Sequence, residues 1–458
     1  MPVPSPTPAD RPGATFPHLR LRRPTPGLLL LPWARPLEDW REEDLEGSGS
    51  RFRELPVGPS RHLVRFVEAD AATYALKELP RDVAAREYDV LRRLEQLELP
   101  AVAPAGLVDS PERDVAVLVT EYLRHSLQYR RMLMRLPIGA NPYRDRLLDA
   151  MAWLLVDLHR NGVFWGDCSL ANTLFRRDGD RIQAYLVDAE TSEVHPSLSD
   201  GQRRVDLDVL VENVAFGLAD LAAALGRPED MDDAVGAAES VRARYDALWD
   251  ELFTEPELTP GDRFAVAARV RRLNELGFAV EEVELRPRGE GRLRLRAAVT
   301  NRRFHAHELE RLTGIVALEN QARLLLNDLG EYRAWLEWHE GRRIAPVEAA
   351  ARWQREVVRP RLRELTAALG PGRDPLQAYI DVLEHKWLLS ERVGRDVGLD
   401  AAVRSYLESG APAPETLPEA EDEIVGEAAA PDAGLAAERG LAADVALAEG
   451  GDASGLAR

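Results

Sequence analysis

Residues 158–172 decide the fold of this chain, and their sequence is LHRNGVFWGDCSLAN. Within this stretch Asp167 is followed, after four residues, by Asn172, and a second acid, Asp188, ends the apolar run that comes next. Each of these three side chains carries an oxygen atom that can bind a hard cation, and a carboxylate can also accept a proton. The pattern therefore predicts a reactive site.

The flanking segments indicate how this stretch is held. Apolar residues recur at helical spacing between residues 147 and 158, which predicts a helix that leads into it. Beyond it, residues 173–177 and 181–187 predict two short strands joined by Asp178-Gly179, a pair typical of hairpin turns. Asp188 is therefore expected at the end of the second strand of a hairpin.

Asp, four residues and then Asn is the catalytic-loop spacing of phosphoryl-transfer enzymes with the protein-kinase fold. In such enzymes the protein positions the reactants and neutralises charge on the transferred phosphoryl group. Asp167 is accordingly the predicted catalytic residue, which orients an attacking hydroxyl and accepts its proton. Asn172 and Asp188 are predicted metal ligands, because Mg²⁺ binds few protein oxygens alongside the phosphates.

The lysine content of the chain indicates a further member of the site. Lys77 and Lys386 are the only lysines among 59 basic residues, so a retained lysine is a candidate for a role that arginine cannot fill. Lys77 lies in a strand-like run, and its compact ammonium group suits a contact to phosphate oxygens. Ten residues later Glu87 lies in a helical run, where it is predicted to form an ion pair with Lys77. A solvated surface lysine is the alternative, and the catalytic loop downstream disfavours it.

With these residues in this order, the sequence resembles the protein-kinase-like superfamily. Within it, the sequence resembles the bacterial lipopolysaccharide kinase (Kdo/heptose kinase-like) group, with small-molecule phosphotransferases as more distant relatives. The resemblance covers roughly residues 52–250 and implies ATP and Mg²⁺ as cofactors. It implies a hinge in which Glu121 and Leu123 contact adenine, and it implies that Asp206 or Asp208 braces the catalytic loop. The remainder is similar to a domain of unknown function that accompanies such kinase-like halves, which adds no activity.

The chain departs from the protein-kinase pattern in front of the catalytic Asp. Trp165-Gly166-Asp167 stands where protein kinases have His-Arg-Asp. Gly166 matches the His-Gly-Asp of small-molecule phosphotransferases, and it leaves no arginine to bind an activation-loop phosphate. The departure argues against a phosphorylation-activated protein kinase.

Two further departures affect the nucleotide site. Ala189-Glu190 follows Asp188 in place of Phe-Gly, and Glu190 is either a further metal ligand or a polar strand end. The predicted phosphate-covering loop contains one glycine, Gly58, where the family pattern has three, and a single glycine beside proline is most often a turn. ATP affinity is then low, or Lys77 and the metal hold the phosphates.

The preferred hypothesis is therefore an ATP- and Mg²⁺-dependent kinase that phosphorylates a hydroxyl group of a small molecule, a sugar or a glycolipid. A catalytically weak nucleotide-binding pseudokinase or scaffold is the main alternative, because the glycine loop is poor. A protein kinase is a further alternative that Gly166 disfavours. The presence of Lys77, Asp167, Asn172 and Asp188 together favours activity.

Composition limits the other function classes. A net charge of −19 disfavours a general binder of nucleic acids or of anionic membranes. Cys168 is the single cysteine, so no intramolecular disulfide forms, and it is interpreted as a packing residue of the loop. With no signal peptide or spanning segment recognised, we expect no stable membrane insertion and a cytoplasmic location.

The C-terminal half offers fewer motifs. Twelve arginines and seven acids lie between Arg263 and Thr313, in a region predicted as a helix, two strands and a second helix. Nucleic-acid binding through residues 263–313 is a third hypothesis, and an arginine-rich solvated surface is favoured over it because interleaved aromatic residues are missing. Amphipathic helices follow, with Trp335, Trp338, Trp353 and Trp387 as expected core or interface residues. A protein partner could bind through this helical part.

The predicted fold class is α+β: a two-lobed protein-kinase-like fold followed by a mainly α-helical C-terminal domain with a small β-hairpin. Both ends are expected to be disordered, because the first 26 residues hold eight prolines and residues 411–458 hold eleven acidic and two basic residues. The expected divisions are a disordered arm at 1–26, the N-terminal segment and small lobe at 27–122, the large lobe at 123–255, the helical domain at 256–410 and an acidic tail at 411–458.

Overall fold

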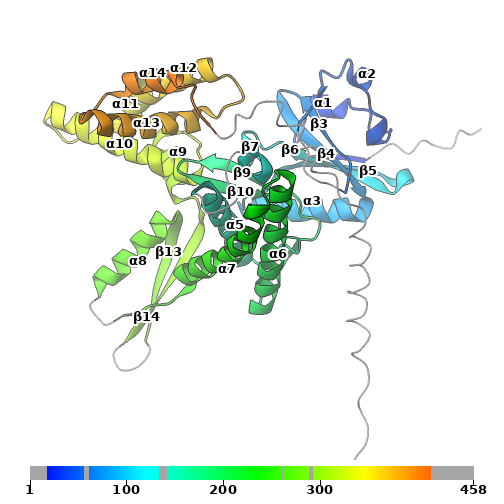
Figure 1. Cartoon of the computed structure of the whole chain (residues 1–458), viewed down its shortest axis with the longest axis horizontal. Helices are drawn as coiled ribbons and strands as arrows, with labels where there is room; N and C mark the ends of the chain where they lie inside the picture. The colour runs from blue at the N-terminus through cyan, green and yellow to red at the C-terminus, as the bar shows by residue number, and fades with distance from the viewer. Residues whose placement is uncertain (1–17, 56–60, 134–141, 259–261, 288–291, 414–458) are drawn as a thin grey trace, which may run out of the picture.

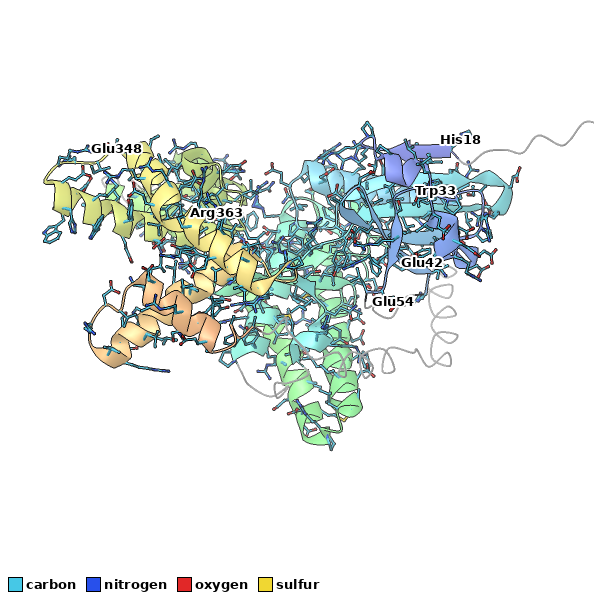
Figure 2. The ribbon with its side chains drawn as sticks, turned by 90° about the horizontal axis from the view of Figure 1, so that it is seen from above. His18, Trp33, Glu42, Glu54, Glu348 and Arg363 are labelled. Carbon is cyan, nitrogen blue, oxygen red and sulfur yellow. The ribbon has the colours of Figure 1, made fainter. Side chains whose placement is uncertain are left out.

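The computed structural model of the chain describes residues 18–55, 61–133, 142–258, 262–287 and 292–413. It has a small strand-rich lobe, a larger and more helical lobe, and a C-terminal helical region (Figure 1). Seen from above, the N-terminal lobe with His18 and Trp33 lies at one end, and the helices that carry Glu348 and Arg363 lie at the other (Figure 2). The predicted α+β fold class is confirmed.

A six-stranded antiparallel sheet forms the small lobe, in the order β1-β5-β6-β4-β3-β2. Helix α3 packs on one face of this sheet, and the N-terminal segment with Leu28, Trp33 and Trp40 covers the other face with a second apolar cluster. The elements are β1 (His18–Leu21), α1 (Pro26–Leu29), a 3₁₀ turn (Leu37–Asp39), α2 (Glu42–Leu45), β2 (Arg51–Arg53), β3 (Val64–Ala69), β4 (Ala72–Pro80), α3 (Arg81–Gln96), β5 (Pro104–Ser110) and β6 (Val115–Glu121).

The expected disordered arm is wrong for residues 18–26. Strand β1 pairs with β5 from His18 opposite Asp109 to Leu21 opposite Gly106. Alternate residues of β1 pack towards the sheet, so two leucines in the strand supply an apolar face that proline content alone does not reveal. Residues 1–17, where most of these prolines lie, fall outside the described residues.

Helices α5, α6 and α7 form the large lobe around the predicted hairpin, which is present as β9 and β10. Leucines along α5 are buried, as their helical spacing predicts. The elements are β7 (Ser126–Leu127), α4 (Tyr129–Leu133), α5 (Pro142–Arg160), β8 (Val163–Phe164), β9 (Thr173–Asp178), β10 (Arg181–Leu186), β11 (Glu193–Val194), α6 (Asp200–Ala224) and α7 (Met231–Phe253).

A small sheet, β12-β14-β13, and helix α8 come next, and they pack with the large lobe. The ring of Phe278 is fully buried at 5.8 Å from the ring of Trp153 on α5. The expected boundary at residue 256 therefore does not separate two cores, because the helical core begins at Ala306. The elements are β12 (Glu257–Leu258), α8 (Arg263–Glu275), β13 (Phe278–Pro287) and β14 (Leu293–Arg302).

The C-terminal region is helical and has its own core, in which Trp353 is fully buried. Trp335, Trp338 and Trp387 lie on its surface, so only one of the four tryptophans is a core residue. The helices are α9 (Phe304–Thr313), α10 (Glu319–Glu340), α11 (Pro346–Trp353), a π-helical turn (Gln354–Val358), α12 (Arg359–Leu369), α13 (Pro375–Val393) and α14 (Leu399–Glu408).

The last described residues are still part of this core. Ala411 is buried and its carbonyl accepts a hydrogen bond of 2.8 Å from Arg373, so the expected tail does not begin at residue 411. Residues 414–458 lie outside the described part of the chain. Among the helices that the structure describes, none has the length and apolar composition needed to cross a membrane.

Candidate functional site

Strand β4, helix α3 and the end of the hairpin bring three charged side chains together between the lobes. Lys77 Nζ lies 3.1 Å from Glu87 Oε2 and 2.9 Å from Asp188 Oδ2. The predicted ion pair between Lys77 and Glu87 is thus present, although 10 residues separate them, and Asp188 joins it from 111 residues away. Lys77 is fixed between two carboxylates, so its ammonium group has a defined position.

Burial and charge shift the pKa values in this cluster. Burial in a largely apolar environment raises the pKa of Glu87 to about 7, and the neighbouring Lys77 ammonium opposes this rise. Burial alone would lower the pKa of Lys77, but Glu87 and Asp188 outweigh it and raise the pKa above its ordinary value. Lys77 therefore keeps its charge in this site.

The predicted catalytic loop that follows α5 depends on one glycine and one buried acid. Gly166 has φ +83°, and a Cβ there would lie 2.9 Å from the carbonyl oxygen of Thr191, so a side chain does not fit. Asp206 on α6 is fully buried and accepts hydrogen bonds from the backbone N–H groups of Trp165 (2.6 Å) and Gly166 (2.7 Å). Of the two acids proposed to brace the loop, Asp206 does so, whereas Asp208 pairs with Arg242 at the surface.

A histidine in the quoted stretch completes this support. His159 Nε2 lies 3.1 Å from Asp206 Oδ2, and its Nδ1 lies 2.9 Å from the hydroxyl of Tyr245. Burial lowers the pKa of His159 and favours the neutral ring. Because a carboxylate only accepts hydrogen bonds, Nε2 donates to Asp206 and Nδ1 accepts from Tyr245. His159, itself bonded to Tyr245, thereby fixes the position of the Asp206 carboxylate.

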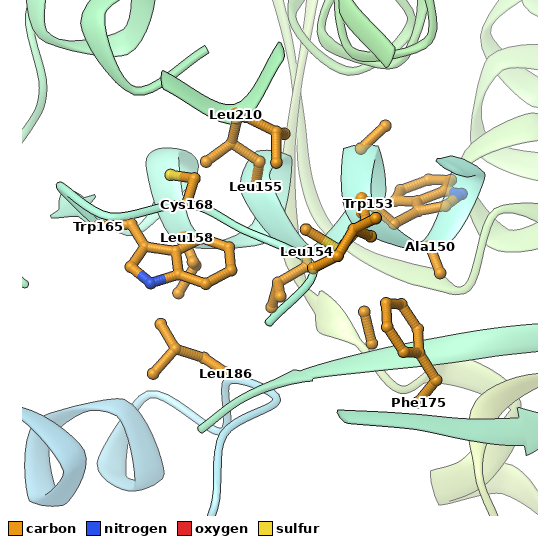
Figure 3. Close-up of a cluster of buried hydrophobic side chains, with 14 of the residues drawn as sticks. Ala150, Trp153, Leu154, Leu155, Leu158, Trp165, Cys168, Phe175, Leu186 and Leu210 are labelled. Carbon is orange, nitrogen blue, oxygen red and sulfur yellow. The ribbon is translucent and has the colours of Figure 1, made fainter. Parts of the chain in front are cut away.

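Trp165 and Cys168 pack beneath the loop among Leu155, Leu158 and Leu210 (Figure 3). Both side chains are fully buried, and burial raises the pKa of the Cys168 thiol well above its ordinary value. A protonated thiol without access to solvent is inert. This environment agrees with the interpretation of Cys168 as a packing residue.

Asp167 is exposed at the surface of the loop, and two amides contact its carboxylate. Asn172 Nδ2 donates to Asp167 Oδ2 at 2.9 Å, and Asn213 Nδ2 lies 3.5 Å from Asp167 Oδ1 and 3.0 Å from the carbonyl oxygen of Cys168. Asn213 lies on α6 and is not among the site residues predicted from the sequence. No sequence motif marks it, because 46 residues separate it from Asp167.

A cavity of about 170 Å³ opens between the lobes next to these residues. Lys77, Asn172 and Asp188 lie at its polar side, and Val64, Phe66, Ala75 and Leu174 contribute apolar side chains. The predicted hinge residues Glu121 and Leu123 also line it. The cavity thus combines an apolar slot with a polar side at which the Lys77 cation lies beside the oxygen-bearing side chains of Asn172 and Asp188.

Of the two remaining predicted residues, Glu190 lies apart from this arrangement. The Glu190 carboxylate is 3.2 Å from His62 Nε2, in the segment that enters β3, and Glu190 is not among the residues lining the cavity. Its backbone N–H donates to Asp188 Oδ1 at 3.1 Å, which helps to orient that acid. Gly58 lies outside the described residues.

Comparison with known proteins agrees with this geometry. Residues 67–225 match the model of the lipopolysaccharide kinase (Kdo/WaaP) family, and residues 247–410 match a domain of unknown function, DUF4032. The family match confirms the resemblance predicted from the sequence, and it identifies residues 67–225 as a kinase-like phosphotransferase domain.

Among solved structures, one described as WaaP in complex with acyl carrier protein is similar to this chain with 20% identity and a TM-score of 0.32. The alignment covers 51% of this chain and 99% of that protein. At that TM-score it carries no argument about shape or partners. A search of curated proteins gave no match.

Proposed function

Since residues 67–225 form a kinase-like phosphotransferase domain, we propose that the chain transfers the γ-phosphoryl group of ATP, with Mg²⁺, to a hydroxyl group of a small molecule, sugar or glycolipid. The observation that carries this proposal is the position of Lys77 between Glu87 and Asp188, at the wall of a cavity that Asn172 also lines. A cation beside two potential metal ligands is the arrangement that a triphosphate needs.

The nucleotide is proposed to lie with its base in the apolar part of the cavity. Strand β6 ends at Glu121, and Leu123 follows it at the edge of the cavity, where backbone groups can hydrogen-bond a base. Apolar side chains from β3 and β4 form one wall of the slot. Lys77 then meets the phosphates, and its ion pairs fix the ammonium group before they bind.

The residues present fit a magnesium ion. Asn172 uses its amide nitrogen to donate to Asp167, which leaves its side-chain oxygen for a cation. Asp188 supplies a carboxylate to the same cavity, and Mg²⁺ prefers such oxygen atoms and retains waters and phosphate oxygens as its other ligands. A bound Mg²⁺ would neutralise phosphate charge. Glu190 is not needed for this, because its carboxylate contacts His62.

Asp167 is proposed to orient the acceptor hydroxyl and to accept its proton. Its carboxylate is exposed, and the amides of Asn172 and Asn213 restrain it. Gly166 precedes it, where the close approach of Thr191 leaves no room for the arginine of regulated protein kinases. This supports a small-molecule or glycan acceptor. A location in the cytoplasm, where ATP is available, is part of the same proposal.

The test is to replace Asp167 by Asn and to measure turnover and nucleotide binding. We expect turnover to fall by about 10²- to 10⁴-fold, the usual contribution of a positioned base, with binding of ATP and Mg²⁺ retained in a thermal-shift assay. Asp208→Asn is the matched control, because Asp208 lies at the surface in a pair with Arg242. Unchanged turnover in Asp167→Asn contradicts the proposal, and nucleotide binding without transfer to a broad panel of acceptors favours a pseudokinase or scaffold.

A further inference from the structure

We propose that the C-terminal helical region, residues 304–411, positions the metal-binding pair of the kinase site by anchoring the far end of the β9–β10 hairpin. The near end of this hairpin carries Asn172 and Asp188. The chemical role of that pair rests on the proposed function, whereas the anchoring contacts are independent of it.

Both predicted ligands are continuous with the near end of the hairpin. Thr173 pairs with Leu186, and the backbone N–H of Val187 donates to the carbonyl oxygen of Asn172 at 3.1 Å. Asn172 therefore directly precedes β9, and Asp188 follows β10 by two residues. A tilt of the hairpin moves both side chains relative to Lys77 on the opposite lobe.

The turn at the far end is inserted into the helical region. Asp178 is fully buried, and its carboxylate accepts hydrogen bonds from Asn320 Nδ2 (2.9 Å) and from the backbone N–H of Gln321 (2.8 Å) at the start of α10. Gly179 donates its N–H to Gln377 Oε1 on α13 at 2.9 Å, and its carbonyl accepts from Gln377 Nε2 at 3.1 Å. Hairpin turns normally lie at the surface in water, so this one is held by protein groups instead.

The approach of the turn to the helices is too close for a side chain. Gly179 has φ +65°, and a Cβ at this position would lie 2.7 Å from Leu324 Cδ1 and 3.2 Å from the carbonyl oxygen of Asn320. Glycine satisfies both the left-handed backbone and the contact. The Asp178-Gly179 pair thus serves the turn and its anchoring together.

Strand β9 has a second attachment to α13. Arg177 donates to both carboxylate oxygens of Asp381, at 2.7 Å and 2.6 Å, and Gln377 Nε2 donates to the same carboxylate at 3.0 Å. Asp381 is 8% exposed, so the pair is largely shielded from water and salt. A bidentate arginine–carboxylate pair fixes direction as well as distance. Turn and strand are therefore both held by α13.

Helix α5 packs against β10, whose Ile182 and Ala184 lie in the large-lobe core, but strand pairing beyond the hairpin is short. Strand β7, its neighbour in the small sheet, contributes two residues, which pair with Arg176 and Phe175. Two-stranded hairpins are only marginally stable alone, and strands of six residues span about 20 Å. A small rotation at the far end thus produces a displacement of ångström size at the other. The helical region restrains this rotation from the side of β9 and of the turn.

Two variants loosen the anchor without touching the nucleotide site: Gln377→Ala and Asp381→Asn. Asp328→Asn is the matched control, because Asp328 is an acid of α10 that accepts hydrogen bonds from Trp353 and Tyr379, both inside the helical region. The probe is Mn²⁺ with a non-hydrolysable ATP analogue, and the readouts are metal affinity by electron paramagnetic resonance and hydrogen exchange of residues 172–188. Thermal melts monitor the loss of stability in each variant.

We expect both anchor variants to bind Mn²⁺ about tenfold more weakly, at the lower end of the effect of removing groups that orient metal ligands. The loss of metal-free nucleotide affinity should be smaller, because Leu174 is the one residue of β9 that lines the cavity. Exchange at residues 186–188 should quicken. Asp328→Asn should lower the melting temperature and leave metal affinity as in the wild type. Equal losses of metal affinity in the control and the anchor variants, or unchanged affinity in both anchor variants, would overturn the proposal.

Arg177→Lys is the milder second variant, which keeps the charge and removes the bidentate geometry, in case the larger changes prevent folding. It too should weaken Mn²⁺ binding, and an unchanged affinity would count against the anchor. A wild type that binds Mn²⁺ and nucleotide but transfers no phosphate refutes the proposed function and leaves the anchor intact. If the wild type binds no metal–nucleotide at all, both ideas fail.

Discussion

The catalytic loop and the C-terminal helical region are each organised around one fully buried side chain, and the two side chains differ in kind. For the loop it is Asp206 of α6, whose carboxylate accepts hydrogen bonds from two backbone N–H groups and from His159. In the helical region it is Trp353, which fills the core and donates its indole N–H to Asp328. In an irregular loop, buried backbone N–H groups need hydrogen-bond acceptors from elsewhere in the protein. A helix pairs its own backbone groups and is stabilised by packing its apolar face.

The largest expected effect comes from removing the acid. Asp206→Ala leaves the N–H groups of Trp165 and Gly166 without their acceptor in a buried setting, and each such group costs about 1–3 kcal/mol. For the two groups together we expect a loss of stability of about 2–6 kcal/mol, together with loss of turnover, because Asp167 follows these residues directly. Urea unfolding and a turnover assay measure the two effects. Asp208→Ala is the control. An Asp206→Ala protein of normal stability would show that the loop keeps its conformation without the Asp206 carboxylate.

The next effect is of similar size but is confined to the other region. Trp353→Ala removes a buried ring, which costs about 3–5 kcal/mol, whereas Trp338→Ala removes a ring that is 78% exposed and should change stability by less than about 0.5 kcal/mol. Local unfolding, measured by hydrogen exchange, should concentrate in α10–α13 in the first variant. A Trp353→Ala protein that exchanges fastest at the catalytic loop would contradict the separation of the two cores.

The same contrast explains what the sequence could predict about the site. Asp167 and Asn172 are close in the chain, so their spacing alone predicts that they share a site, and Lys77 and Glu87 are brought together by a strand and the helix directly after it. Asp206 and Asp208 could not be separated from sequence, because the choice depends on which face of α6 meets the loop. His159 lies inside the quoted stretch, yet its role appears only when Asp206 and Tyr245 are placed beside it.

Contacts between regions distant in sequence were beyond prediction for a physical reason. Gln377 meets Gly179 across 198 residues, and nothing in either segment specifies the other. An Asp-Gly turn predicts a hairpin, but it also predicts exposure to water, and here the turn is buried. The N-terminal strand β1 was missed in a similar way, since its pairing partner β5 lies more than 80 residues away.

The last and smallest effect tests whether the buried acid of the small lobe behaves as its surroundings imply. Burial raises the pKa of Glu87 from an ordinary value near 4.5 to about 7, so the folded protein binds this proton more tightly than the unfolded chain. The stabilising contribution is therefore complete below about pH 4.5 and is lost as pH rises through about 7. Glu87→Gln removes this titration, and its stability should fall less than that of the wild type between pH 5 and 8 in urea unfolding.

Nucleotide affinity should respond in the opposite sense, because the charged Glu87 that forms above pH 7 holds Lys77. The wild type should bind the nucleotide a few-fold more tightly at pH 8 than at pH 6, and the variant should not. Parallel stability profiles in the two proteins would show that Glu87 is ionised throughout and that the ion pair with Lys77 outweighs its burial.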